Sequence, residues 1–162
     1  MKKNIFHFII ICIALVSCNE QKETDVNLVK YNKNLVVAKQ FIDVFSSKDS
    51  AKEASLLSDD FKWNGSEIGQ DSLSKEVLLK GDRDIMRMFN DIKLMNADYY
   101  PGVDSTYKIN SEVRVYGTWV SKFVSSGKTS KMKYYAVFTF NDAGKITVLE
   151  EHCNIADLTK EL

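Results

Sequence analysis

The stretch that decides the fold is EVRVYGTWVSKFVSSGKTSKMKYYAVFTFNDAGKITVLEEHCN, residues 112–154. Apolar and polar residues alternate along 112–124, 132–140 and 146–154, the pattern of β-strands that bury one face. Residues 125–128 and 141–144 are rich in Ser, Gly, Asn and Asp, which favour turns. The stretch therefore predicts three consecutive antiparallel strands joined by two hairpin turns.

Helices are predicted to precede these strands. Apolar residues recur at spacings of three and four over 35–45 and over 85–95, with Asp82 as a plausible N-cap of the second helix. The other assignments are a short helix at 51–57, a strand at 59–63, no clear pattern at 64–80, a turn at Pro101-Gly102 and a C-terminal helix at 155–162. Helices followed by a run of antiparallel strands indicate an α+β domain.

The N-terminus predicts a cleaved signal over residues 1–17. Lys2 and Lys3 precede an apolar run, residues 5–16, that is shorter than the roughly 20 residues of a membrane-spanning helix. The end of the run, Leu15-Val16-Ser17-Cys18, resembles the lipobox of bacterial lipoproteins. That resemblance implies that Cys18 carries acyl chains, palmitate among them, and holds the protein at a membrane. An ordinary secretory signal with an incidental cysteine is the alternative.

This interpretation sets the domain organisation and the expected location. Residues 1–17 are the lipoprotein signal peptide, 18–32 the lipidated cysteine with a polar tether, and 33–162 the domain. We expect the protein in the cell envelope, lipid-anchored at the periplasmic or surface face of a bacterial membrane, with the outer membrane as first choice.

The composition excludes several function classes. Without the two lysines of the signal, 20 basic side chains stand against 22 acidic ones, so we expect no nucleic-acid partner. Cys153 is the one cysteine left in the domain, which excludes an internal disulfide, and His152 is its one histidine, which excludes a multi-histidine metal site. No phosphate-binding or dinucleotide motif occurs, so we expect neither a metal nor a cofactor.

Several short motifs point to a family. They are Gly81 before a helix, Tyr116-Gly117-Thr118-Trp119, Gly127-Lys128, Asp142-Ala143-Gly144-Lys145-Ile146, and residues 150–158, EEHCNIADL. Residues 33–162 resemble the nuclear transport factor 2-like superfamily, nearest its SnoaL-like branch. The resemblance implies a cone-shaped, curved antiparallel sheet wrapped around N-terminal helices, with a pocket at one end. It implies no single activity, because function in such families follows the site.

Hairpin pairing predicts which side chains face that pocket. If Phe140 lies opposite Ile146 and Val124 opposite Lys131, one face collects Trp119, Ser121, Tyr134, Ala136, Glu150, His152 and Asn154. A shift of one residue would invert this set. Alternatively, Trp119 and Tyr134 are ordinary core residues, and Glu150 and His152 lie at the solvated mouth.

Three function classes follow. The cyclases of this branch use an aspartate at the end of the last strand, which aligns with Asn154 here, so we favour non-catalytic binding of a small apolar ligand by a membrane-tethered domain. An isomerase, cyclase or hydrolase using Glu150 and His152 as acid and base is one alternative. A homodimeric interaction module is the other, through the opposite sheet face, which carries Tyr116, Thr118, Val120, Tyr135, Val137 and Thr139.

Overall fold

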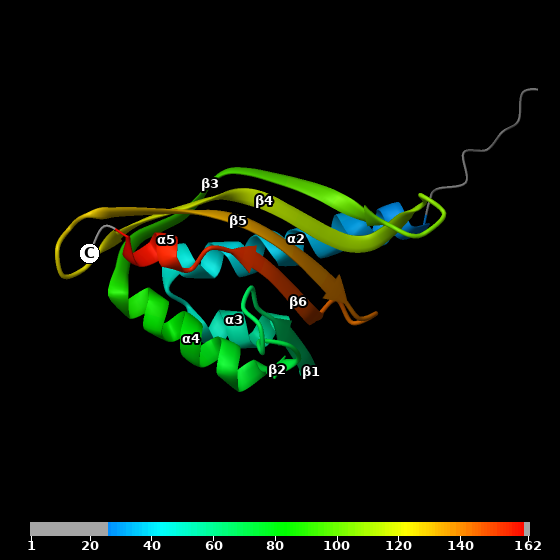
Figure 1. Ribbon diagram of the computed structural model, residues 1–162. Coiled ribbons are helices and arrows are strands. Elements are labelled where there is room, and N and C mark those ends of the chain that lie inside the picture. Colours follow the sequence, from blue (N-terminus) through cyan, green and yellow to red (C-terminus); the bar gives the residue numbers. More distant parts are fainter. Residues whose placement is uncertain (1–25, 161–162) are drawn as a thin grey trace, which may run out of the picture.

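The computed structural model describes residues 26–160 (Figure 1). The predicted signal and Cys18 lie outside the described residues. Along the chain the elements are α2 (Val26–Ser47), α3 (Ser50–Leu56), β1 (Leu57–Asn64), β2 (Leu73–Ser74), α4 (Lys75–Met88), β3 (Phe89–Val103), β4 (Ile109–Phe123), β5 (Thr129–Phe140), β6 (Ile146–Cys153) and α5 (Ala156–Thr159). No helix in this part of the chain is both long and apolar enough to span a membrane.

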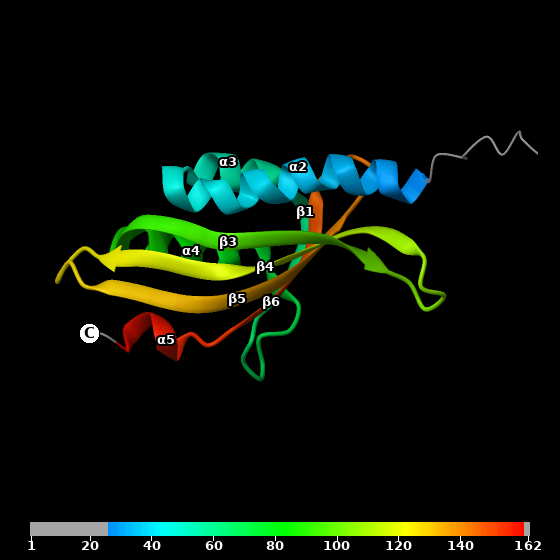
Figure 2. The same ribbon diagram turned by 90° about the horizontal axis from the view of Figure 1, so that it is seen from above.

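The predicted α+β fold class is confirmed. The strands form one six-stranded sheet in the order β2-β1-β6-β5-β4-β3, and the sheet curves over the helices (Figures 1 and 2). Neighbouring strands are antiparallel except β1 and β6, which run parallel. The sheet is therefore mixed, and its one parallel pair joins strands that β2, α4, β3, β4 and β5 separate along the chain.

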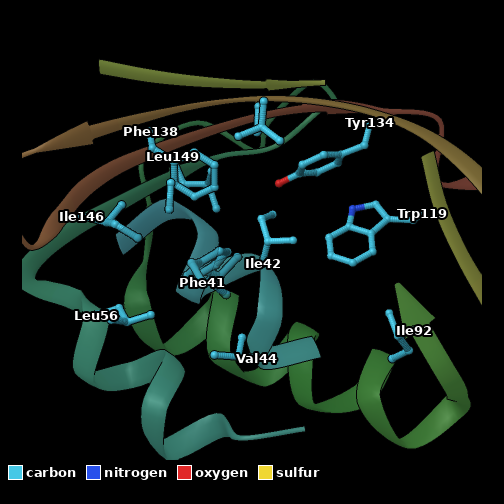
Figure 3. Packing of buried hydrophobic residues seen from close by; sticks show 14 of the residues in the cluster. Phe41, Ile42, Val44, Leu56, Ile92, Trp119, Tyr134, Phe138, Ile146 and Leu149 are labelled. Carbon is cyan, nitrogen blue, oxygen red and sulfur yellow. The ribbon is translucent and has the colours of Figure 1, made fainter. Parts of the chain in front are cut away.

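The core lies between α2 and the inner face of the sheet (Figure 3). Phe41 of α2 meets Phe138 of β5 edge to face, with ring centroids 5.5 Å apart, and both side chains are buried. Full burial of one such side chain stabilises the fold by about 1.5–3 kcal/mol. This contact packs α2 against the middle of the sheet.

The first helix is longer than predicted. It begins at Val26, so residues 26–32, predicted as tether, are helical. Tyr31 and Asn34 are buried, and the Asn34 side-chain amide donates to the carbonyl of Ser111 at 2.8 Å. Tertiary contacts to β4 thus stabilise a polar segment whose sequence alone lacks an apolar stripe.

The second long helix lies earlier than predicted. It ends at Met88, and β3 takes Ile92, Met95 and the Pro101-Gly102 pair, which were assigned to a helix and a turn. Apolar residues at 85, 89 and 92 fit a helical face, but the chain changes period at Phe89. Pro101 is tolerated because β3 is an edge strand, where a missing N–H donor costs no ladder bond.

Two strand registers differ from those predicted, with different consequences. Trp119 of β4 lies opposite Met132 rather than Ala136, a shift of four residues that keeps every side chain on its predicted face. Phe140 does lie opposite Ile146, as predicted, but the pairing then slips by one residue between Thr139 and Phe140. Beyond this bulge the inward face of β6 carries the residues that were predicted to point outward.

Candidate functional site

A pocket of about 310 Å³ lies between the inner face of the sheet and α4. Five rings line it, Phe45, Trp63, Phe89, Trp119 and Tyr134, together with the aliphatic and sulfur side chains of Ile85, Ile92, Met132, Cys153, Ile155 and Leu158. Its polar lining consists of Glu67, Gln70, Asp82, Ser121 and Glu151. A mostly apolar cavity of this size with a few polar groups is the usual form of a small-molecule site.

The structure brings together part of the predicted pocket face. Trp119, Ser121 and Tyr134 line the pocket, whereas Ala136 is fully buried without reaching it. Figure 3 shows Trp119 and Tyr134 extending from the sheet toward the helices. The ring of Trp119 lies 5.1 Å from that of Phe45 and 5.6 Å from that of Tyr134, so the indole is both packed and part of the wall.

Three of the predicted pocket residues do not line the inner pocket, and two of them, His152 and Asn154, line a hollow on the outer face instead. Glu150, His152 and Asn154 are exposed, and none of them lines the inner pocket. The imidazole of His152 instead stacks on the ring of Tyr135 at 5.4 Å, on the outer face. The cause is the one-residue bulge in β6, which exchanges Glu150 and His152 for Glu151 and Cys153 at the inner face.

Glu151 is the polar centre of the pocket. Its carboxylate accepts a hydrogen bond from the Tyr134 hydroxyl at 2.7 Å and one from the Trp63 indole N–H at 2.8 Å. Burial raises the pKa of Glu151, and these two hydrogen bonds act in the opposite direction. Burial, and after it the charge of Glu151, raises the pKa of Tyr134 well above its usual range, so the phenol stays protonated as a donor.

Asp82 of α4 and Glu53 of α3 form a second acidic pair. Glu53 is fully buried, and no donor within residues 26–160 reaches either of its carboxyl oxygens or Oδ2 of Asp82. Burial raises the pKa of Asp82 well above its usual range, and the neighbouring Glu53 carboxyl raises it further. A proton shared between the two groups is therefore the hydrogen bond that this pair can make.

The sequence held a signal for Asp82 that the predicted helix boundary concealed. Asp82 is four residues after Leu78 and three before Ile85, so it lies on the apolar stripe of α4 rather than at its N-cap. Ser74 occupies the cap position. A carboxyl on the apolar face of a helix indicates a buried polar site.

Nucleophilic and metal chemistry receive little support from the geometry. Burial raises the pKa of the Cys153 thiol, which keeps it protonated and a poor nucleophile. Within the described residues no group of three or more His, Cys, Asp or Glu side chains is arranged to hold a metal ion.

A second hollow, of about 500 Å³, is open and lies on the outer face of β4, β5 and β6. An aromatic row crosses this face from β3 to β6: Tyr100 to Tyr116 at 6.0 Å, Tyr116 to Tyr135 at 4.6 Å, and Tyr135 to His152 at 5.4 Å between ring centroids. The row coincides with the face predicted for a dimer. Because this hollow contains no buried carboxyl, the inner pocket is the stronger candidate for small-molecule chemistry.

Comparison with known proteins identifies the fold. No family model and no curated protein matches the chain. Among solved structures, a proposed isomerase from Bacillus subtilis matches with a TM-score of 0.67 at 14% identity, over 81% of this chain and 93% of that one. A proposed polyketide cyclase from a Silicibacter species matches with a TM-score of 0.64 at 16% identity, over 82% of this chain and 96% of the other. A nuclear transport factor 2-like protein of unknown function from Burkholderia pseudomallei matches with a TM-score of 0.61 at 16% identity, over 79% and 95% of the two chains. The chain has the nuclear transport factor 2-like fold, as predicted.

Proposed function

We propose that this protein is a membrane-tethered binding protein whose inner pocket holds a small, mostly apolar ligand. The observation that carries the proposal is the pocket of about 310 Å³, which five aromatic rings and three acidic side chains line. The rings supply apolar contact area, and the carboxyl groups orient a polar part of the ligand.

The proposed lipid on Cys18 would place this pocket away from the membrane surface. Seven residues, 19–25, separate Cys18 from the start of α2. Fully extended they span at most about 25 Å. The pocket residue Phe45 is 19 residues along α2 from Val26, about 28 Å further along the helix axis. A ligand could then enter from the aqueous side while the protein stays anchored.

The experiment is a ligand screen read by intrinsic fluorescence. The chain has two tryptophans, Trp63 and Trp119, and both line the pocket, so their emission reports occupancy directly. Every described element lies within residues 26–160, so a form that starts at Asn19 keeps the complete core. Trp119→Ala should weaken binding at least tenfold.

Glu150→Gln and His152→Gln are matched controls on the exposed face, and neither should change the affinity. Binding that depends on the exposed pair and not on Trp119 would contradict the proposal.

A second candidate, an isomerase, cyclase or hydrolase, is favoured by the carboxyl groups with raised pKa in an apolar pocket. Here the acid and base would be Asp82 and Glu151 rather than the exposed pair. One carboxylate would accept a proton from the ligand while one carboxylic acid donates a proton to it. Turnover that is lost in Glu151→Gln while binding persists would favour this enzyme over a binding protein.

The outer aromatic row favours a homodimer that could coexist with either function. Tyr116 is 43% exposed and stacks on Tyr135 at the centre of the sheet, a position suited to the middle of an interface. Sedimentation of the soluble form should give a dimer that Tyr116→Lys converts to a monomer. A monomeric wild type at high micromolar concentration would reject this assembly.

A further inference from the structure

The inner pocket is lined by two neighbouring carboxyl groups, those of Asp82 and Glu151. The Tyr134 hydroxyl and the Trp63 indole N–H both donate to Glu151, so neither donor is free for a ligand. Asp82 lines the same pocket, and the proton that it shares with Glu53 leaves that pair with one negative charge. A ligand group that meets these carboxyl groups can supply hydrogen-bond donors to them.

The charged residues that line the pocket also favour a ligand that donates hydrogen bonds. Glu67, Asp82 and Glu151 line it, and of the residues between 26 and 160 no lysine, arginine or histidine does so. The ion pairs of the described chain, such as Lys30 with Asp142, all lie elsewhere. Buried carboxyl groups without a cation raise the energy of the ionised site, and a bound cation would relieve it.

The walls distinguish an organic cation from a metal ion. Five aromatic rings surround the cavity, and ring faces attract ammonium groups. The acidic side chains are not arranged as a metal-ligand cluster in the described part of the chain. A hydrated metal ion would also leave the apolar walls unfilled, whereas an amine with an apolar body would contact both regions.

We infer that the ligand of the inner pocket is a small organic amine in its ammonium form, with its cationic group toward Asp82 and Glu151 and its apolar body between the rings. This inference rests on the proposed ligand-binding function and gives it a substrate class. Glu53 supports the site indirectly, because the buried pair that it forms with Asp82 holds one shared proton and keeps one negative charge.

The test compares three probes of equal size by calorimetry on the form that starts at Asn19: benzylamine, benzyl alcohol and benzoate. Benzylamine should bind at least about tenfold more tightly than benzyl alcohol, a difference of about 1.4 kcal/mol, and benzoate should bind most weakly. Asp82→Asn removes the acid that shares a proton with Glu53, and Glu151→Gln removes a carboxyl group, both at nearly constant shape. Each should cut the preference for benzylamine to below about threefold.

Glu150→Gln removes a charge from the exposed face of the same strand and should leave the preference intact. Equal binding of benzylamine and benzyl alcohol would overturn the amine class and leave the ligand-binding function standing. Binding of none of the probes, or binding unaffected by Trp119→Ala, would reject both. If Asp82→Asn does not fold, Glu151→Gln decides, and a preference that survives it overturns the inference.

Discussion

Truncation of Trp119 to alanine tests whether the inner pocket is a real cavity rather than loosely packed core. Truncating a fully buried aromatic residue costs about 3–5 kcal/mol, the sum of lost apolar transfer and the cavity left behind. The cavity part amounts to about 2.4 kcal/mol per 100 Å³ of new void. Trp119 borders an existing space of about 310 Å³, so its removal enlarges a pocket that water can enter instead of creating a dry void.

We therefore expect Trp119→Ala to lower the free energy of unfolding by about 1–3 kcal/mol, mostly the transfer component. Phe138→Ala is the matched reference, because Phe138 is an aromatic residue of the adjacent strand with no exposed surface and no contact with the pocket. It should cost about 3–5 kcal/mol.

The assay is equilibrium urea unfolding of both variants and the wild type, followed by circular dichroism, so that neither tryptophan is needed as a probe. The slope of the free energy against urea should stay constant across the set. A loss for Trp119→Ala equal to or larger than that for Phe138→Ala would refute the reasoning, because the indole would then be plain core.

Three further predictions follow from the anchor, the lone thiol and the buried acids. Cys18→Ala should abolish acyl labelling and release the protein from membranes, and persistence of a detergent-sensitive anchor would contradict the lipobox interpretation. The denatured domain should titrate one thiol, Cys153, and mass spectrometry should find no intramolecular disulfide. Burial raises the folded-state pKa of Glu53, Asp82 and Glu151 above the unfolded values of about 4. At a pH between the unfolded and the folded pKa values, the folded protein therefore binds more protons than the unfolded chain. The free energy of unfolding should fall as pH rises from about 4. Glu53→Gln should flatten that fall in urea titrations, and an unchanged slope would mean that the acidic pair does not share a proton.

The fold was predictable because its signals are redundant. Alternation over 112–154, two Gly-containing turns and the helical period over 35–45 each restrict the same α+β arrangement, so errors at element ends leave it intact. The observed boundaries differ from the predicted ones where tertiary contacts determine them. The Asn34 side chain donates a hydrogen bond from α2 to β4, and Phe89 begins a long edge strand whose first apolar residues also fit a helical period.

The site was less predictable, because it depends on strand register. A four-residue error between β4 and β5 left Trp119 and Tyr134 on the correct face, but a one-residue bulge in β6 exchanged Glu150 for Glu151. The bulge had a readable signal. Ile146 and Leu149 both have apolar side chains and are both buried, although they are three residues apart, and a regular strand cannot point both toward one side.

The incorrect predictions also concern carboxyl groups whose burial does not stabilise the fold. Asp82 was predicted as a helix cap, and neither Glu53 nor Glu151 was among the predicted site residues. Yet Asp82 and Glu151 line one pocket, and Glu53 lies buried beside Asp82. Apolar residues of similar shape at these positions would remove a desolvation cost of a few kcal/mol per group. A protein that keeps unpaired acids inside an aromatic cavity sacrifices stability at that place, and such local conflicts are expected where a site must meet a ligand.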